Sequence, residues 1–130
     1  MLKLIVDENI ALAADIFNQF GDVKLVSGRY ITNSLLQDID ILIVRSITNV
    51  DEGLLKNTSV KFVGTATIGT DHIDLDYLKK NNIIFADAKG CNAFSVAEYV
   101  LAALLNFSVK YDFLLKDKSI GIVGVGNVGS

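Results

Sequence analysis

The C-terminal residues of this chain combine an apolar run with three closely spaced glycines, a pattern that can hold phosphate groups. Gly124-x-Gly126-x-x-Gly129 directly follows residues 119–123, which are predicted to form a β-strand. In such a motif the first glycine permits a tight turn and the second lets a pyrophosphate approach the backbone, while the third lets a following helix pack on the strand. We therefore predict that a dinucleotide binds at these glycines and at the intervening Asn127 and Val128.

The rest of a dinucleotide site is expected to lie further along a longer chain. The helix that receives the phosphates would begin after Gly129, and a carboxylate for the ribose hydroxyls is expected about 20 residues later. The sequence ends at Ser130. We therefore expect this polypeptide to contain only the start of a cofactor domain and to be inactive alone.

Two hydroxyl groups follow runs that are predicted to be buried strands. Ser46 follows residues 41–44, and Thr67 lies in a glycine-rich loop after residues 61–63. Each hydroxyl can donate a hydrogen bond to a carboxylate or phosphate, or can instead cap nearby backbone. Gly64 and Gly69 bracket Thr67, and they either let loop N–H groups converge on an anion or serve ordinary turn formation. From the residues alone, both interpretations of Ser46 and Thr67 stay open.

Arg45 and Asn92 are further candidates for substrate binding. Arg45 could hold the negative charge of a substrate, or it could form a salt bridge with Asp7 or Glu8 at the end of an adjacent strand. Those two acids are neighbours on a strand, so their side chains diverge and paired acid–base work is disfavoured. Asn92 either contacts substrate or caps the helix after it, and capping is the favoured interpretation.

The single histidine and the single cysteine give little support for catalysis within this chain. His72 invites the role of general base, but its flanking residues are typical of the start of a short helix, where an imidazole satisfies backbone groups. Cys91 beside a helix start could be reactive, although a buried inert thiol is expected. One histidine and one cysteine offer no plausible ligand spacing for a metal. We therefore assign no catalytic residue and no metal site.

The elements that must position these groups alternate between strands and helices. Short apolar runs at residues 2–6, 23–26, 41–44, 61–63 and 83–86 predict strands, and helical spacing of apolar residues lies between them. This alternation predicts an α/β fold with a parallel sheet, whose ligands bind at the carboxyl ends of the strands.

A longer helix is predicted over residues 92–113, opening with Asn92 and a Ser95-x-x-Glu98 capping box. It is apolar on most of its circumference, which indicates burial on more than one side. We therefore divide the chain into a substrate domain at 1–92, a crossover helix and linker at 93–116, and the start of a cofactor domain at 117–130.

Composition excludes several classes of function. Hydrophobic residues make up 51% of the chain, yet we expect no apolar run to reach the length of a membrane span. The net charge of -3 argues against a nucleic-acid partner, which needs a basic face. One cysteine excludes an internal disulfide and, with the absence of a secretory apolar region at the N-terminus, favours a cytoplasmic location.

Several stretches together give a more specific resemblance. They are Val6-Asp7-Glu8-Asn9, Val44-Arg45-Ser46-Ile47-Thr48, the loop from Phe62 to Asp74, Gly90-Cys91-Asn92-Ala93, Val96-Ala97-Glu98-Tyr99-Val100 and the Gly124 motif. In this order they resemble the D-isomer-specific 2-hydroxyacid dehydrogenases, with the Phe62 to Asp74 loop the most specific part. Lys89 is a departure, because such enzymes usually have proline before the Gly-Cys-Asn turn.

The resemblance implies a flavodoxin-like substrate domain followed by the first strand of a Rossmann NAD-binding domain. It implies NAD as cofactor, a small phosphorylated hydroxy acid as substrate, and a homodimer. The family uses the positions of Ser46 and Thr67 for substrate contact, and its catalytic arginine, acidic residue and histidine would lie beyond Ser130.

A second hypothesis comes from a different class, the receiver domains of two-component signalling. Asp7 and Glu8 after the first strand, Thr65 or Thr67 after the fourth and Lys89 after the fifth fit that pattern. A receiver needs a phosphoaccepting aspartate after the third strand, where this chain has Arg45 and Ser46. Only a pseudo-receiver without phosphorylation would be compatible, and it would not explain the long helix leading to a glycine motif.

Overall fold

The computed structural model describes residues 1–116 and 118–129; Asp117 and Ser130 lie outside the described residues. The chain divides into two compact units, Met1–Ala88 and Lys89–Ser130. The first unit alternates strands with short helices along the chain. Its elements are β1 (Leu2–Asp7), α1 (Ala13–Phe17), β2 (Gly21–Val26), η1 (Gly28–Tyr30), η2 (Asn33–Leu36), β3 (Ile41–Val44), α2 (Glu52–Leu55), β4 (Phe62–Thr65), α3 (Leu75–Lys80) and β5 (Ile84–Ala86).

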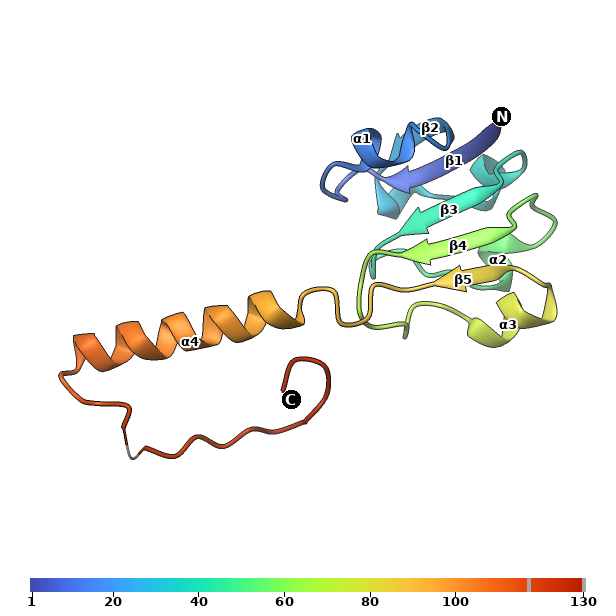
Figure 1. Ribbon diagram of the computed structural model, residues 1–130. Helices are drawn as coiled ribbons and strands as arrows, with labels where there is room; N and C mark the ends of the chain where they lie inside the picture. The colour runs from blue at the N-terminus through green and yellow to red at the C-terminus, as the bar shows by residue number, and fades with distance from the viewer. Residues whose placement is uncertain (117, 130) are drawn as a thin grey trace. The chain divides into compact units, whose positions relative to one another are not determined.

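The five strands form one parallel sheet in the order β2-β1-β3-β4-β5 (Figure 1). Leu4 of β1 pairs with Ile41 of β3, which confirms that these two runs are parallel neighbours. Val44 and Thr65 are paired at the ends of β3 and β4. Because all the strands are parallel, the loops that follow them gather at one edge of the sheet.

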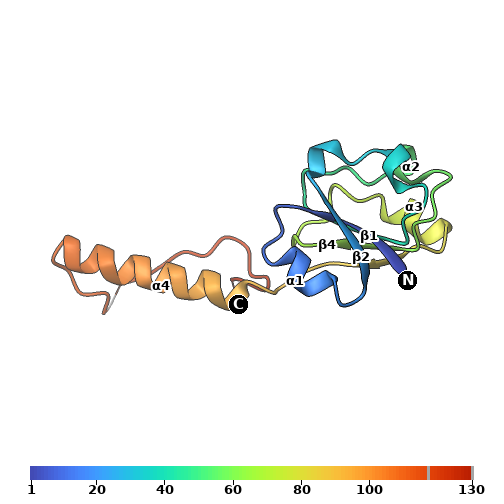
Figure 2. The same cartoon turned by 90° about the horizontal axis from the view of Figure 1, so that it is seen from above.

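Helices cover the two faces of this sheet, with α1 on one face and α2 and α3 on the other (Figure 2). Leu4 and Val6 face α1, whereas Ile5 belongs to the larger core under α2 and α3. A central strand that is buried on both faces needs a continuous apolar run rather than an alternating one. This is why β1 and β3 consist largely of Leu, Ile and Val.

Two loops at the carboxyl edge are fixed by caps and by a bridge between them. The Asp51 side chain accepts from Leu54 N at 3.0 Å at the start of α2, and Asp74 accepts from Tyr77 N at 2.9 Å at the start of α3. Val50 and Ile73 form an isolated parallel bridge. The loop after β3 and the loop after β4 are therefore joined to each other beyond the sheet.

In the second unit, α4 (Ala93–Lys110) is the long helix. It is shorter than the predicted span to residue 113, because Asp112 has a φ of 51°, which is outside the right-handed helical region. The predicted caps are wrong: the Asn92 side chain makes no cap hydrogen bond, and Ser95 lies inside the helix rather than before it.

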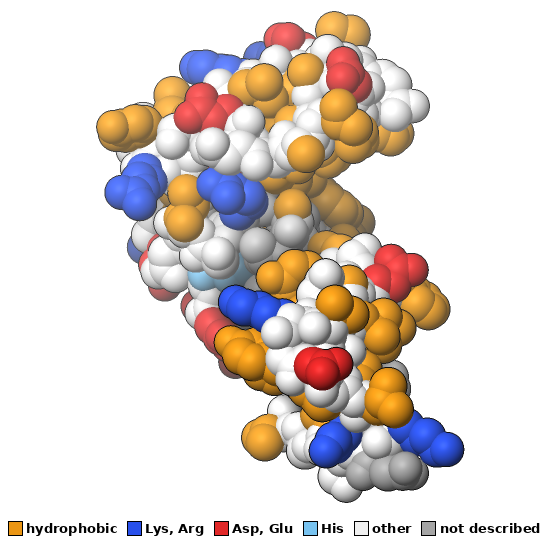
Figure 3. Space-filling model, turned by 90° about the vertical axis from the view of Figure 1, so that its left-hand side faces the viewer, with side chains coloured by type: hydrophobic (Ala, Val, Ile, Leu, Met, Phe, Trp, Pro, Cys, Tyr) orange, Lys and Arg blue, Asp and Glu red, His pale blue; other side chains and the backbone are white. Residues whose placement is uncertain are grey.

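The surface of α4 differs from the expectation of burial on several sides. No residue of α4 is buried in the described part of the chain. Its 18 residues have a mean hydropathy of 1.3, so by length and composition it could span a membrane, contrary to the expectation from sequence. A single helix of this kind is weak evidence for a membrane, since core helices of soluble proteins have the same composition. Figure 3 shows hydrophobic side chains at the surface.

Residues 119–123 do not form the predicted strand of a second domain. A strand needs a hydrogen-bonded neighbour, and the described part of the second unit contains no other strand to pair with it. The apolar composition of residues 119–123 is compatible with a strand. It does not provide the neighbouring strand with which these residues would pair.

Candidate functional site

The carboxyl edge of the sheet carries a buried ion pair between the ends of β1 and β3. Arg45 Nε lies 3.2 Å from Asp7 Oδ2, and the Asp7 side chain is fully buried while that of Arg45 is 34% exposed. Asp7 Oδ1 also accepts from the backbone N–H of Asn9 at 2.9 Å. The pairing with Asp7, one of the two alternatives for Arg45, is therefore present.

In this ion pair Arg45 bonds Asp7 through its Nε alone. Among the described residues, no group accepts a hydrogen bond from the terminal nitrogens of Arg45. The guanidinium has five N–H donors in a rigid fork, so Nε can bond Asp7 while the terminal nitrogens still face an anion. Glu8 is exposed and lies in the turn after β1, whereas Asp7 is buried.

Ser46 lies in a tight turn immediately after β3. The turn is closed by a hydrogen bond of 3.2 Å from Thr48 N to the Arg45 carbonyl. The Ser46 side chain is exposed, and its hydroxyl has no hydrogen-bond partner in the parts of the chain that the structure describes. The hydroxyl does not cap nearby backbone, so it is available to a ligand.

Thr67 stands at the equivalent place after the neighbouring strand. Val44 and Thr65 are paired, and Ser46 and Thr67 each follow this pair by two residues. The Thr67 hydroxyl lies 2.8 Å from Thr65 Oγ1 and donates weakly to the Gly69 carbonyl at 3.4 Å. The structure therefore brings Arg45, Ser46 and Thr67 to adjacent strand ends.

The loop that carries Thr67 also exposes backbone donors. The amides of Thr67, Ile68, Gly69 and Thr70 donate to no acceptor within residues 1–116 and 118–129. Unpaired N–H groups in a loop form sites that attract anions. Together with the Arg45 fork and two hydroxyls, they make this edge of the sheet suited to a carboxylate or phosphate.

His72 bonds to a side chain rather than to backbone groups. Its Nε2 lies 3.0 Å from Thr65 Oγ1, a hydroxyl that is buried at the end of β4. Burial lowers the pKa of His72 below 6.5, against the opposing effect of the Asp71 carboxylate. A ring already bonded to a buried hydroxyl is poorly placed to take a proton from a substrate.

From the sequence, Thr65 was a candidate only for a receiver domain, and its place beside the candidate substrate site was missed. Thr65 lies within a buried strand, where a threonine resembles ordinary core composition. The spacing Thr65-x-Thr67 was the available signal, since residues two apart in an extended chain point to the same side.

The remaining candidate for substrate binding, Asn92, belongs to the second unit. It is exposed and directly precedes α4. Cys91 beside it is exposed, so the expectation of a buried thiol is wrong. No group of three or more potential metal ligands occurs among the described residues.

The glycine motif in the second unit forms a tight turn. Gly124 has a φ of +91°, which favours glycine, and an added Cβ there would meet no atom within 4 Å. A Cβ on Gly129 would collide with the Gly124 carbonyl oxygen. The turn thus requires both glycines and leaves open space at Gly124 and Gly126, which fits the close approach of a pyrophosphate.

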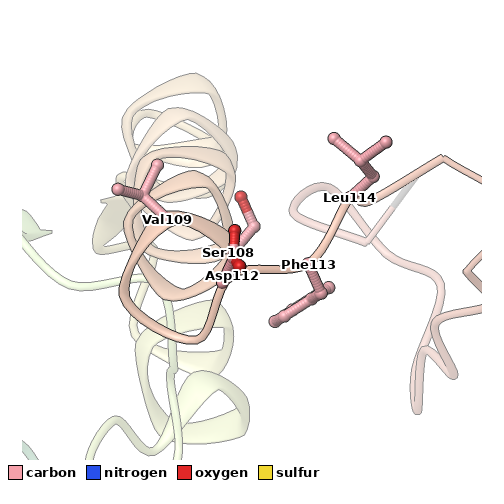
Figure 4. Close-up of a pocket in the computed structure, with 5 residues that line it drawn as sticks. All are labelled: Ser108, Val109, Asp112, Phe113 and Leu114. Carbon is pink, nitrogen blue, oxygen red and sulfur yellow. The ribbon is translucent and has the colours of Figure 1, made fainter.

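Of two hollows on the surface, one borders the candidate site and the other contains none of its groups. One, on the α1 face of the sheet, is lined by residues that include Ile43, Phe62, Gly64 and Thr65, so it borders the strand end described above. The other lies at the C-terminal end of α4 and contains Asp112 as its only charged side chain (Figure 4). The second hollow brings together no catalytic or anion-binding groups.

Curated relatives of high similarity share one name. The chain is 54% identical over 129 residues to the erythronate-4-phosphate dehydrogenase of Chromohalobacter salexigens, and 52% identical over 128 residues to that of Baumannia cicadellinicola. These matches cover 99% and 98% of this chain but 34% of each relative. The chain therefore spans about a third of the length of the curated relatives it matches.

Solved structures of related dehydrogenases share the fold. The NAD-bound 3-phosphoglycerate dehydrogenase of Entamoeba histolytica is 26% identical with a TM-score of 0.72, covering 98% of this chain and 48% of its own. The D-lactate dehydrogenase of Aquifex aeolicus, complexed with NAD and lactic acid, is 22% identical with a TM-score of 0.68, covering 98% and 45%.

A family model agrees with both sets of relatives. The model described as D-isomer specific 2-hydroxyacid dehydrogenase, catalytic domain, matches residues 4–119. This span includes β2 to β5, all of β1 except Leu2 and Lys3, and the loops with Arg45, Ser46 and Thr67. The chain belongs to the D-isomer specific 2-hydroxyacid dehydrogenase family.

Proposed function

We propose that this chain is the N-terminal part of an NAD-dependent enzyme that oxidises 4-phospho-D-erythronate to 3-hydroxy-2-oxo-4-phosphonooxybutanoate. By family resemblance this reaction belongs to the synthesis of pyridoxal 5'-phosphate. The observation that carries the proposal is the equivalent placement of Ser46 and Thr67 beyond the Val44–Thr65 pair, beside Arg45. The names of the two curated relatives at 52% and 54% identity supply the substrate.

In this proposal the residues of the chain bind and orient the substrate. The Arg45 terminal nitrogens, the two hydroxyls and the loop amides after Thr67 hold its oxyanion groups. NAD, when bound, would accept a hydride from the carbon that bears the 2-hydroxyl, and the hydroxyl proton would pass to a base that the resemblance places outside residues 1–130. The substrate loses its translational and rotational entropy when it binds, so this loss does not add to the barrier of the reaction step.

The second unit contributes the start of the cofactor site. Gly124, Gly126 and Gly129, with Asn127 and Val128 between them, would place backbone N–H groups against the NAD pyrophosphate. Asn92 would contact substrate from the beginning of the connecting helix. We keep the division into a substrate domain at 1–92, a crossover at 93–116 and the start of the NAD domain at 117–130, in a cytoplasmic homodimer.

The test is steady-state kinetics on the full-length protein that carries this chain. Thr67→Ala removes one hydrogen bond to a charged group, worth about 1–2 kcal/mol, so KM for 4-phospho-D-erythronate should rise about 5- to 30-fold. Thr32→Ala is the matched control, because Thr32 is exposed and its hydroxyl bonds only Ser34 Oγ among the described residues. An unchanged KM in Thr67→Ala would make Thr67 a structural residue.

A second substrate separates this proposal from its main alternative. The likeness to 3-phosphoglycerate dehydrogenase favours 3-phospho-D-glycerate as the competing substrate. Oxidation of that acid with a higher kcat/KM than 4-phospho-D-erythronate would assign the enzyme to another activity of the same family.

A further inference from the structure

Three side chains form a continuous hydrogen-bonded chain at the end of β4. His72 Nε2 lies 3.0 Å from Thr65 Oγ1, which lies 2.8 Å from Thr67 Oγ1. Thr65 in the middle is 4% exposed, so water does not compete freely for its hydroxyl. His72 is one end of this chain, and Thr67, at the other end, is the proposed substrate ligand.

Two orders of donation keep the proton of the buried Thr65 hydroxyl hydrogen-bonded within this chain. A hydroxyl has a single proton to donate. If His72 Nε2 is unprotonated, Thr65 donates to the ring and Thr67 donates to Thr65. The outer face of Thr67 then presents lone pairs, which repel an anion. If Nε2 carries a proton, each donation reverses, and the Thr67 proton is free to point outward.

Resting on the proposed function, we propose that His72 is a positioning residue, whose Nε2–H sets the direction of the Thr65–Thr67 chain so that Thr67 donates to a substrate oxyanion. The bond from Thr67 to the Gly69 carbonyl is long, at 3.4 Å, so an incoming oxyanion replaces a weak acceptor. The role requires no proton transfer to or from the substrate.

An anion bound at Thr67 should raise the pKa of His72 for two reasons. Both the imidazolium and one neutral tautomer carry the Nε2 proton, so an anion at Thr67 favours these two forms over the other tautomer. The anion also attracts the charged form directly, and both effects raise the pKa of His72. The charged group that acts on the ring is the Asp71 carboxylate. Asp51 and Asp74 cap α2 and α3, and Asp7 is paired with Arg45.

Because His72 is the only histidine in the 130-residue chain, nuclear magnetic resonance can follow one ring without overlap. Histidine labelled with 15N reports which ring nitrogen is protonated. Sulfate and D-glycerate serve as probes, since they separate a phosphate-like ligand from a carboxylate. Whichever oxyanion binds Thr67 should shift the neutral ring to the Nε2–H tautomer and raise the pKa of His72 by about 0.5 to 1.

The matched control for this measurement is Thr65→Val, which keeps the volume of the side chain but breaks the chain of hydroxyls. In Thr65→Val the anion should no longer change the tautomer. If both anions leave the tautomer and the pKa of the wild-type ring unchanged, the proposal is overturned. The same holds if Thr65→Val responds as the wild type does.

Kinetics of the full-length protein provide a second readout. His72→Gln keeps an N–H donor near the position of Nε2, whereas His72→Phe removes it. We expect KM for 4-phospho-D-erythronate to rise about tenfold in His72→Phe and by much less in His72→Gln, with similar melting temperatures. Equal KM values in the two variants would overturn the positioning role.

Failure of this inference can be told apart from failure of the proposed function. The ring measurement uses sulfate and D-glycerate, so it does not depend on which phosphorylated acid is the substrate. Conversely, Thr67→Ala tests substrate binding whatever the direction of the hydrogen bonds behind Thr67.

Discussion

At the scale of single residues, Arg45 shows that two interpretations of one side chain can both hold. The sequence left open whether Arg45 binds a substrate or a nearby carboxylate. The structure pairs its Nε with the buried Asp7 and leaves the terminal nitrogens without a protein acceptor in the described residues. The ion pair therefore orients the guanidinium and does not compete with anion binding.

Asp7→Asn tests this orientation. The substitution removes the charge that Arg45 pairs with inside a buried cluster, so the free energy of unfolding should fall by about 1–3 kcal/mol. In the full-length protein KM should rise while kcat changes little, because the loss affects substrate binding. Urea unfolding and steady-state kinetics measure the two effects.

Asp22→Asn is the control for Asp7→Asn, since Asp22 is an exposed carboxylate on the edge strand β2. If both substitutions lower the free energy of unfolding equally, the Asp7–Arg45 pair contributes no more to stability than an exposed carboxylate does.

At the scale of secondary structure, the short elements depend on close backbone packing. Gly21 begins β2 and pairs with Leu2 of β1. A Cβ on Gly21 would overlap the Leu2 carbonyl oxygen and approach Leu4 Cδ1 to 2.8 Å. A backbone carbonyl in a sheet cannot move aside as a flexible side chain can, so this position requires glycine.

Gly21→Ala should therefore separate the first residues of β1 and β2 and lower the free energy of unfolding by about 1–3 kcal/mol. Urea denaturation of the 130-residue chain measures this change. Gly121→Ala is the matched control, because a Cβ there meets no atom within 4 Å. An unaltered unfolding midpoint in Gly21→Ala would show that the two strands tolerate a wider spacing.

The sequence predicted the strands and helices that have a local apolar pattern of their own. Apolar runs of Leu, Ile and Val identified β1 and β3, and helical spacing identified α3. The 3-10 helices η1 and η2 were missed because such short turns have no apolar period. The hydrogen bond between Thr65 and His72 was missed because it depends on the tertiary approach of a strand end and a loop. Burial of α4 was overestimated, since composition does not show what covers a helix.

At the scale of the whole molecule, the apolar surface of α4 is the main unsatisfied feature. Large residues along it are exposed, among them Leu101 at 56% and Leu105 at 51%. Contiguous apolar surface of this kind favours association with other protein surface. In the proposed full-length enzyme we expect the remaining chain or a second subunit to cover it.

The 130-residue chain alone should then self-associate, bind NAD weakly and catalyse no oxidation. Light scattering and calorimetry with NAD measure the first two properties. Leu101→Lys with Leu105→Lys, one turn apart on α4, should shift the chain toward monomer. Ile84→Lys, at an exposed position of β5, is the control. Micromolar NAD binding by a monomeric wild type, or dissociation by Ile84→Lys only, would contradict this expectation.

The bridge between Val50 and Ile73 makes the two halves of the proposed substrate site thermodynamically dependent on each other. Val50 N donates to the His72 carbonyl and Asp74 N donates to the Val50 carbonyl, both at 2.8 Å. Opening the loop after β3 therefore breaks backbone bonds of the loop after β4, so the two loops belong to one cooperative unit. Changes around Ser46 and around Thr67 should not combine additively, and an insertion in either loop would disturb the ligand-binding groups of both.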